Sequence, residues 1–131
     1  MRQELLDYFG GLNLGGYTLS QELPWISSDN PLYLKNLKKI YVDRPQTTVE
    51  IIIPTLNGQD VSAETTSVRV FFATDAKALS PDYEDVVADL KTGKDAAAIT
   101  SVNRRDCLVS TSFESDVLVT ELEFRFTTIT N

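Results

Sequence analysis

The sequence predicts an α/β (α+β) fold in which a mostly antiparallel sheet is covered by one main helix, with a short second helix at the N-terminus. Three observations lead to this prediction. Segments rich in β-branched residues follow one another with connections too short for parallel crossovers. Segment 81–91 combines a helix start signal with apolar residues at helical spacing. The last segment, 117–128, alternates apolar and polar residues.

The first expected element is a short amphipathic helix over residues 1–9, which Gly10-Gly11 would end. The apolar residues that share one face of this helix are Met1, Leu5, Leu6 and Phe9.

The composition predicts a single domain. The chain has 131 residues, of which 42% are hydrophobic and 24% charged, and these values are typical of one domain spanning 1–131.

Residues 10–46 are expected to form an irregular, Gly/Pro-rich assembly segment. Glycines and prolines recur through residues 10–34, which predicts irregular chain. The same stretch carries many large apolar side chains, Trp25 among them, and is too apolar for a solvated linker. We therefore expect it to pack on a neighbouring subunit rather than to build a core of its own.

Three β-branched segments, 37–42, 47–53 and 66–74, predict strands. Asn57-Gly58, between the second and the third, is a hairpin signal. A strict two-residue turn there would leave the apolar end of the third strand unpaired. A longer loop at about 55–64 is therefore expected.

The main helix is expected over 81–91. Ser80 would be its N-cap, Pro81 its first residue and Gly93 its stop. Acids in the positively polarised first turn are Asp82, Glu84 and Asp85. The side chains expected to cover the sheet are Tyr83, Val86, Val87 and Leu90.

Two final strands, 107–113 and 117–128, are joined by a turn at 114–116. In the last strand the even positions are mostly apolar and predict a core face. At 3.3 Å per residue it would reach about 40 Å, longer than a compact domain of this size, so it projects or flanks a neighbour's sheet. The polar face that meets water or a partner is Glu121, Glu123, Arg125 and Thr127.

Composition favours binding or structure over catalysis. Histidine is absent, which excludes imidazole catalysis and His-ligated zinc, and Cys107 has no histidine to activate it. We expect no catalytic, cofactor-binding or metal-binding residues. The net charge of −7 disfavours nucleic-acid backbones. No stretch resembles a membrane span or a signal peptide, so a soluble protein made in the cytosol is expected.

Two local patterns have a structural and a functional interpretation. The glycines of residues 10–16 lack the Gly-Lys-Ser/Thr of a phosphate-binding loop and are better explained as a flexible helix exit. Basic residues are either solvated charge or a docking flank for the acids Asp82, Glu84 and Asp85 of another copy. Such head-to-tail contact closes into a ring or grows into a filament. The basic residues are Lys35, Lys38, Lys39, Arg104 and Arg105.

The order of elements resembles the lambda-type tail-terminator proteins of long-tailed bacteriophages over roughly residues 47–129. The likeness rests on Phe71-Phe72 leading into the helix at Ser80-Pro81-Asp82-Tyr83, on Arg104-Arg105-Asp106, and on a final strand ending Leu122-Glu123-Phe124-Arg125-Phe126-Thr127-Thr128-Ile129. The resemblance implies a virion protein, assembled in the host cytoplasm, that forms a hexameric ring. That ring would cap the tail tube and join it to the head connector, with no catalytic residues.

Under this resemblance, the polar face of the last strand would contact the tail-tube protein or the connector or completion protein. Trp25 and the charged residues would lie between subunits. The alternatives are another phage neck or tail protein, such as a tail-completion or tube protein, and a monomeric β-rich binding module. A carboxylate enzyme ranks third.

Overall fold

The computed structural model describes residues 1–24, 36–53, 60–78, 82–114 and 116–130. Predictions for Trp25, Lys35, the Asn57-Gly58 turn and the Ser80-Pro81 helix start lie outside these ranges. The elements in chain order are α1 (Arg2–Gly10), β1 (Thr18–Leu19), β2 (Lys39–Val42), β3 (Gln46–Ile53), β4 (Val61–Asp75), η1 (Ala76–Ala78), α3 (Asp82–Lys91), η2 (Thr92–Asp95), β5 (Arg104–Glu114) and β6 (Val117–Thr130).

The chain folds as a mixed α+β structure with a mostly antiparallel six-stranded sheet. The strand order is β1-β2-β4-β6-β5, and β3 pairs with β4 as well. Because β6 occupies one edge of β4 along nearly its whole length, β3 and β2 share the other edge, one after the other. The parallel pair is β1 with β2, where Thr18 lies opposite Lys39.

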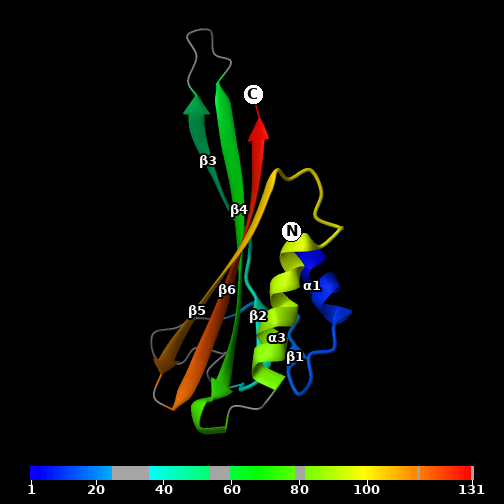
Figure 1. Cartoon of the computed structure of the whole chain (residues 1–131), viewed down its shortest axis with the longest axis vertical. Coiled ribbons are helices and arrows are strands. Elements are labelled where there is room, and N and C mark those ends of the chain that lie inside the picture. Colours follow the sequence, from blue (N-terminus) through cyan, green and yellow to red (C-terminus); the bar gives the residue numbers. More distant parts are fainter. Residues whose placement is uncertain (25–35, 54–59, 79–81, 115, 131) are drawn as a thin grey trace.

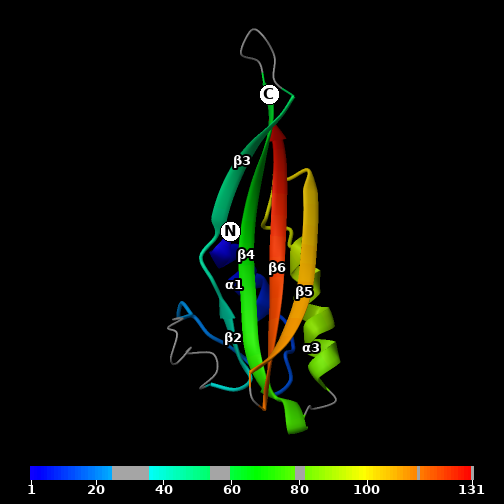
Figure 2. The same ribbon diagram turned by 90° about the vertical axis from the view of Figure 1, so that its left-hand side faces the viewer.

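Both helices lie on one face of the sheet and cover only part of its length (Figure 1). Beyond them, β3, the start of β4 and the end of β6 extend as a narrow projection, and the C-terminus lies beside it. The turned view shows β4 and β6 in the middle of this sheet, with β3 and β5 on its two sides (Figure 2). The expectation that the last strand is long enough to project is confirmed, since β6 has 14 residues.

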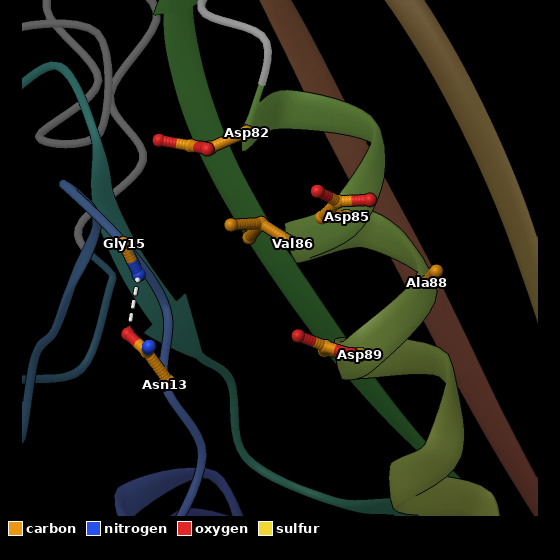
Figure 3. Close-up of a pocket in the computed structure, with 7 residues that line it drawn as sticks. All are labelled: Asn13, Gly15, Asp82, Asp85, Val86, Ala88 and Asp89. Carbon is orange, nitrogen blue, oxygen red and sulfur yellow. Dashed lines mark hydrogen bonds between the residues drawn. The ribbon is translucent and has the colours of Figure 1, made fainter.

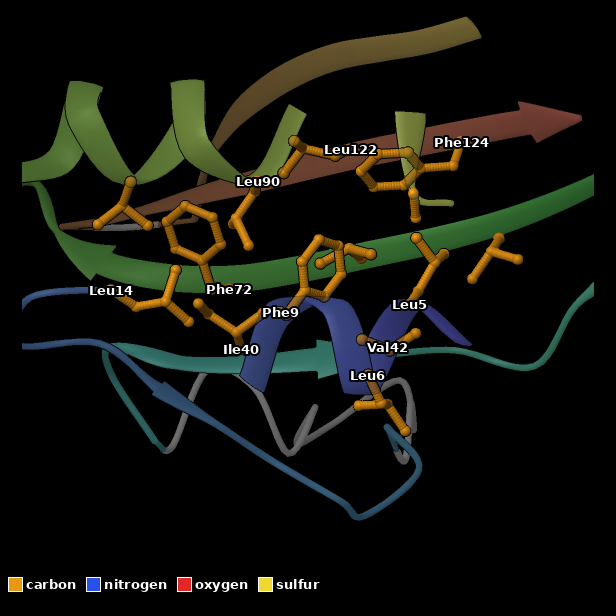
Figure 4. Close-up of a cluster of buried hydrophobic side chains, with 14 of the residues drawn as sticks. Leu5, Leu6, Phe9, Leu14, Ile40, Val42, Phe72, Leu90, Leu122 and Phe124 are labelled. Atoms are coloured by element: carbon orange, nitrogen blue, oxygen red, sulfur yellow. The ribbon is translucent and has the colours of Figure 1, made fainter. Parts of the chain in front are cut away.

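The core lies between the helices and the sheet (Figure 4). Helix α1 contributes Leu5, Leu6 and Phe9 to it, and α3 contributes Val86 and Leu90. The cover is thus shared between two helices, where the sequence predicted one main covering helix. Helix α1 packs closely on η2, the turn after α3, because Gly93 has no side chain: a Cβ atom on Gly93 would lie 2.8 Å from Cε1 of Phe9.

The predicted sheet-facing side of α3 is confirmed. Val86 and Leu90 are buried, and Tyr83 and Val87 pack against the core at half-buried positions. The Tyr83 hydroxyl also reaches across to the hydroxyl of Thr120 on β6, 2.7 Å away. Helix α3 is therefore tied to the centre of the sheet by apolar burial and by one hydrogen bond.

The prediction that residues 10–34 do not join a core within their own chain is wrong for residues 10–24, the part that the structure describes, and their role in assembly stays a prediction. Leu14 and Tyr17 are buried in the core of the chain itself, and the Tyr17 hydroxyl lies 3.1 Å from that of Thr74. Segment 10–46 also supplies β1 and β2 to the sheet. The apolar side chains find their cover locally because the segment runs back along the edge of the sheet and the end of α1.

The predicted loop at 55–64 is also wrong at its C-terminal end, because β4 begins at Val61. Ile51 lies opposite Ser62 and Ile53 opposite Val61, with a bulge between the two pairs. The apolar end of β4 is not left unpaired, since β2 takes over from β3 there. One long strand is thus shared by two short ones, which local turn chemistry cannot reveal.

Candidate interaction surface

The predicted contact residues of β6 lie together on the open face, which we define as the face of the sheet opposite α1 and α3. Leu122, Phe124 and Phe126 point into the core, so the residues between them point the other way. Arg125 lies opposite Asp106 of β5 and Ser67 of β4. The period-two pattern of the sequence therefore identified one continuous polar surface correctly.

Several charges of β4, β5 and β6 on the open face are paired within the chain. The Arg125 guanidinium donates to both carboxylate oxygens of Glu123, at 3.0 and 3.2 Å, which raises the pKa of Arg125. Arg104 pairs with Asp106 at 2.9 Å, and Arg69 bridges Glu121 at 3.2 Å. Exposed pairs of this kind contribute only about 0–1 kcal/mol each to stability. The result is a pre-ordered polar surface of alternating sign.

This surface is hollowed where the twisted sheet curves. A depression of about 590 Å³ extends over β3, β4, β6 and β5. It is broad and shallow and lies on the side of the sheet away from the core, which suits contact with another macromolecule better than enclosure of a small ligand. Its lining includes Glu50, Arg104, Glu123, Arg125, Thr127 and Ile129.

Farther from the projection, several residues of the open face are buried. Tyr41, Phe71 and Ala73 alternate to the side opposite the helices, yet they are buried. Arg69 stacks over the Phe71 ring at 5.3 Å from its centroid and marks the border between the covered and the uncovered part. On β4 and β6 the exposed part of the open face is therefore the part that lies toward the projection, whereas Ser110 and Ser112 of β5 are exposed beside the buried part.

The predicted acidic residues lie on the exposed side of α3. Asp82 and Asp85 border a second hollow, of about 340 Å³, between the helix and the loop at residues 13–15 (Figure 3). Asn13 accepts a hydrogen bond from the Gly15 amide there, at 3.2 Å. Gly15 has a φ of 60°, and a Cβ atom on it would lie 3.4 Å from a carboxylate oxygen of Asp82. Glu84 is exposed as well.

The predicted basic residues do not form one flank. Lys38 lies over the Tyr17 ring and next to Gly16, and Lys39 pairs with Glu22 at 3.9 Å. Because Gly15 adjoins Asp82, Lys38 belongs to the acidic end of the molecule. Arg104 lies on the open face, opposite Thr127. The expected separation of basic and acidic flanks is therefore absent for these residues.

Arg105, which was predicted to lie in an interface, forms several hydrogen bonds within its own chain. Its guanidinium donates to the carbonyls of Lys94 and Ala96, both at 3.1 Å, and to that of Ile99. These bonds hold η2 and the chain that follows it against the helix-facing side of β5. A side chain committed to three carbonyls within its own chain is not available to a neighbour.

We expect Arg105→Met to lower the free energy of unfolding by about 2–4 kcal/mol, because charge-assisted hydrogen bonds to half-buried carbonyls are lost. Arg104→Met is the matched control, since the Arg104 side chain is 74% exposed and pairs with Asp106 on the surface. It should cost no more than about 1 kcal/mol. Urea unfolding of both variants tests this, and equal losses would contradict the assignment.

The described residues include one cysteine, Cys107, which is half buried. Burial raises the pKa of the Cys107 thiol to about 11, so it stays protonated at neutral pH. The described residues contain no group of three or more His, Cys, Asp or Glu placed to hold a metal ion. No helix in the described ranges is long and apolar enough to cross a bilayer.

Comparison with protein-family models gave no match, and comparison with curated protein sequences gave none. One feature of the surface was missed by sequence reasoning: several apolar side chains of β3, a segment predicted only to be a strand, are exposed. The run Ile51-Ile52-Ile53 signals it, because three successive apolar residues on a strand cannot all face one core.

Proposed function

We propose that this chain is a structural virion protein, a tail terminator of a long-tailed bacteriophage. It would form a ring, most simply a hexamer, that caps the tail tube and joins it to the head connector. Its partners would be further copies of itself, the tail-tube protein, and the connector or completion protein. The proposal includes no enzymatic step, no cofactor, no membrane contact and no sequence-specific nucleic-acid contact.

The observation that carries this proposal is the projecting end of the sheet. Its strands extend past the helices, and Val49, Ile51 and Ile129 remain about half exposed or more, at 65%, 57% and 49%. A monomer would keep this apolar surface in water, whereas an assembly would bury it. The polar open face, with its charges already paired, offers a second surface for docking on a tube or connector ring.

Two alternative functions would use the open face and the projection differently. Another phage neck or tail protein, such as a tail-completion or tube protein, would share the ring but not the capping activity. A monomeric β-rich binding module would use the hollow of the open face for a ligand. The shallow hollow and the exposed projection favour assembly over the module.

The mass of the particle in solution tests the ring. We expect light scattering coupled to size exclusion to give about six times the 14.6 kDa of one chain, with the same mass over a tenfold range of protein concentration. A ring that buries apolar surface should persist in 0.5 M salt, because screening weakens charge pairs but not apolar contacts. A single chain mass at every concentration would reject the ring and support the binding module.

A further inference from the structure

The exposed apolar side chains gather on two strands. Among the described residues, nine large apolar side chains are exposed, and seven of them lie on β3 and β5. These seven are Val49, Ile51, Ile52 and Ile53 on β3, and Leu108, Val109 and Phe113 on β5. Phe113 has the largest exposed fraction of the nine, 71%.

Both strands are edges in the part of the sheet that the structure describes. There β3 pairs with β4 and β5 pairs with β6, and each has its other side turned outward (Figure 2). Edge strands of monomers are usually blunted by charges, prolines or short length. Here β3 has eight residues with one charge, Glu50, and residues 107–113 of β5 carry none. Both edges therefore have the character of strands that pair with another chain.

We propose that β3 of one copy pairs with β5 of the next copy, so that the sheet continues from subunit to subunit. This inference rests on the proposed ring and specifies its contact. The occupant of each edge is a second copy of this chain. Backbone hydrogen bonds would supply much of the affinity, and the apolar side chains of the two edges, which would cover one another, would supply the specificity.

The direction of the strands fits this pairing. β3 is antiparallel to β4, β4 to β6, and β6 to β5, so β3 and β5 run in opposite directions. A copy that continues the sheet in the same sense places its β3 antiparallel to β5 of its neighbour. Antiparallel pairing is the more stable arrangement per residue.

The two faces also match. Val109 lies opposite Leu122 and so faces the helix side of the sheet, and Val49, opposite Glu64, faces the same side. Leu108 lies opposite Glu123 and Ile52 lines the hollow, so both face the open side. When neighbouring sheets continue with their open faces on one side, apolar residues therefore meet apolar residues on both faces.

Length suggests a register. The uncharged stretch 107–113 of β5 has the same number of residues as stretch 47–53 of β3. Antiparallel alignment of the two places Ile51 beside Val109 and Glu50 beside Ser110. Glu50 is exposed, and in this register it meets a hydroxyl donor and no second acid.

Pairing of unlike edges accounts for both apolar edges at once. A twofold contact of β5 with β5 would leave the edge of β3 in water, and a contact of β3 with β3 would leave β5 uncovered. Contact between β3 and β5 uses both in every subunit. It is a heterologous contact, which closes into a ring when the rotation per subunit divides a full turn.

Disulfide trapping tests the pairing. In a Cys107→Ala background, Glu50→Cys is combined in turn with Leu108→Cys, Ser110→Cys and Ser112→Cys, all of which lie on the open side of β5. We expect mild oxidation to give a ladder of two to six linked chains, most efficiently with Ser110→Cys. Directly opposite residues of an antiparallel pair have Cβ atoms about 4.5–5.5 Å apart, so a small shift of the two strands is enough to form a disulfide.

The single-cysteine variants are the matched controls, because each can link only like edges. Dimers from Glu50→Cys alone or from Ser110→Cys alone would overturn the pairing of unlike edges in favour of a twofold contact. A particle of ring mass with no ladder in any double variant would overturn the pairing and leave the ring intact. A single chain mass by light scattering would reject both proposals together.

Discussion

Phe124→Ala should lower the free energy of unfolding by about 3–5 kcal/mol, among the largest losses expected for one core residue. Phe124 is fully buried at the centre of β6. Its ring centroid lies 5.9 Å from that of Phe9 on α1, and it stacks on Phe126 with centroids 6.5 Å apart. Removing the ring leaves a cavity where the sheet meets α1, which the backbone of a long paired strand cannot close.

Guanidinium unfolding followed by circular dichroism measures this loss. Leu37→Ala is the control, since Leu37 is apolar but 45% exposed and lies outside the core cluster and both edge strands. It should change the free energy of unfolding by no more than about 1 kcal/mol. Similar losses for the two variants would show that α1 does not pack on β6 as described.

The final strand was the element most predictable from sequence, for a physical reason. One face of β6 is covered by helices and the other is polar, so the side chains alternate in hydropathy, and alternation is a local signal. The same holds for α3, where the large apolar residues recur at helical spacing and are buried or half buried. When one face of a helix or strand is buried and the other is exposed, the pattern of apolar residues in that segment is enough to predict the element.

The pairing of β4 first with β3 and then with β2 could not be predicted from local sequence patterns. Turn residues indicate that two strands form a hairpin, but they do not fix how far the pairing runs. The pairing of Tyr41 with Phe71, which adds β2 to the same edge, joins residues far apart in sequence. The share of α1 in the core was likewise non-local, since it depends on the close approach of Phe9 to Gly93.

The two arginines at the start of β5 show why site prediction was partial. Arg104 and Arg105 are identical in local sequence terms, and both were placed in an interface. Adjacent residues on a strand face opposite sides, so Arg104 lies on the open face and Arg105 turns toward the carbonyls that follow η2. Arg105 is bound within the chain because residues 96–99 pass beside it, and no motif in the sequence indicates where that segment lies.

Under the proposed function, the double variant Glu121→Lys/Glu123→Lys should abolish capping while leaving the ring intact. Glu121 pairs with Arg69 and Glu123 with Arg125, so lysine at either position places like charges side by side on the open face. Both carboxylates are at the surface, and the loss of such pairs costs little stability. A docking surface of alternating sign, in contrast, becomes predominantly positive along β6 and β4, which repels a partner that matched the original pattern.

Tube assembly measured by electron microscopy tests this. With the unchanged protein, tubes grown from tail-tube protein should stop at a defined length, and with the double variant their lengths should spread without limit. Glu64→Lys/Asp89→Lys is the matched control, because it makes the same change in net charge at exposed positions away from the open face. Tubes of normal length with Glu121→Lys/Glu123→Lys would remove the open face from the joining surface. Loss of the ring itself would place these carboxylates between the subunits of one ring, where strand pairing alone had been expected to act.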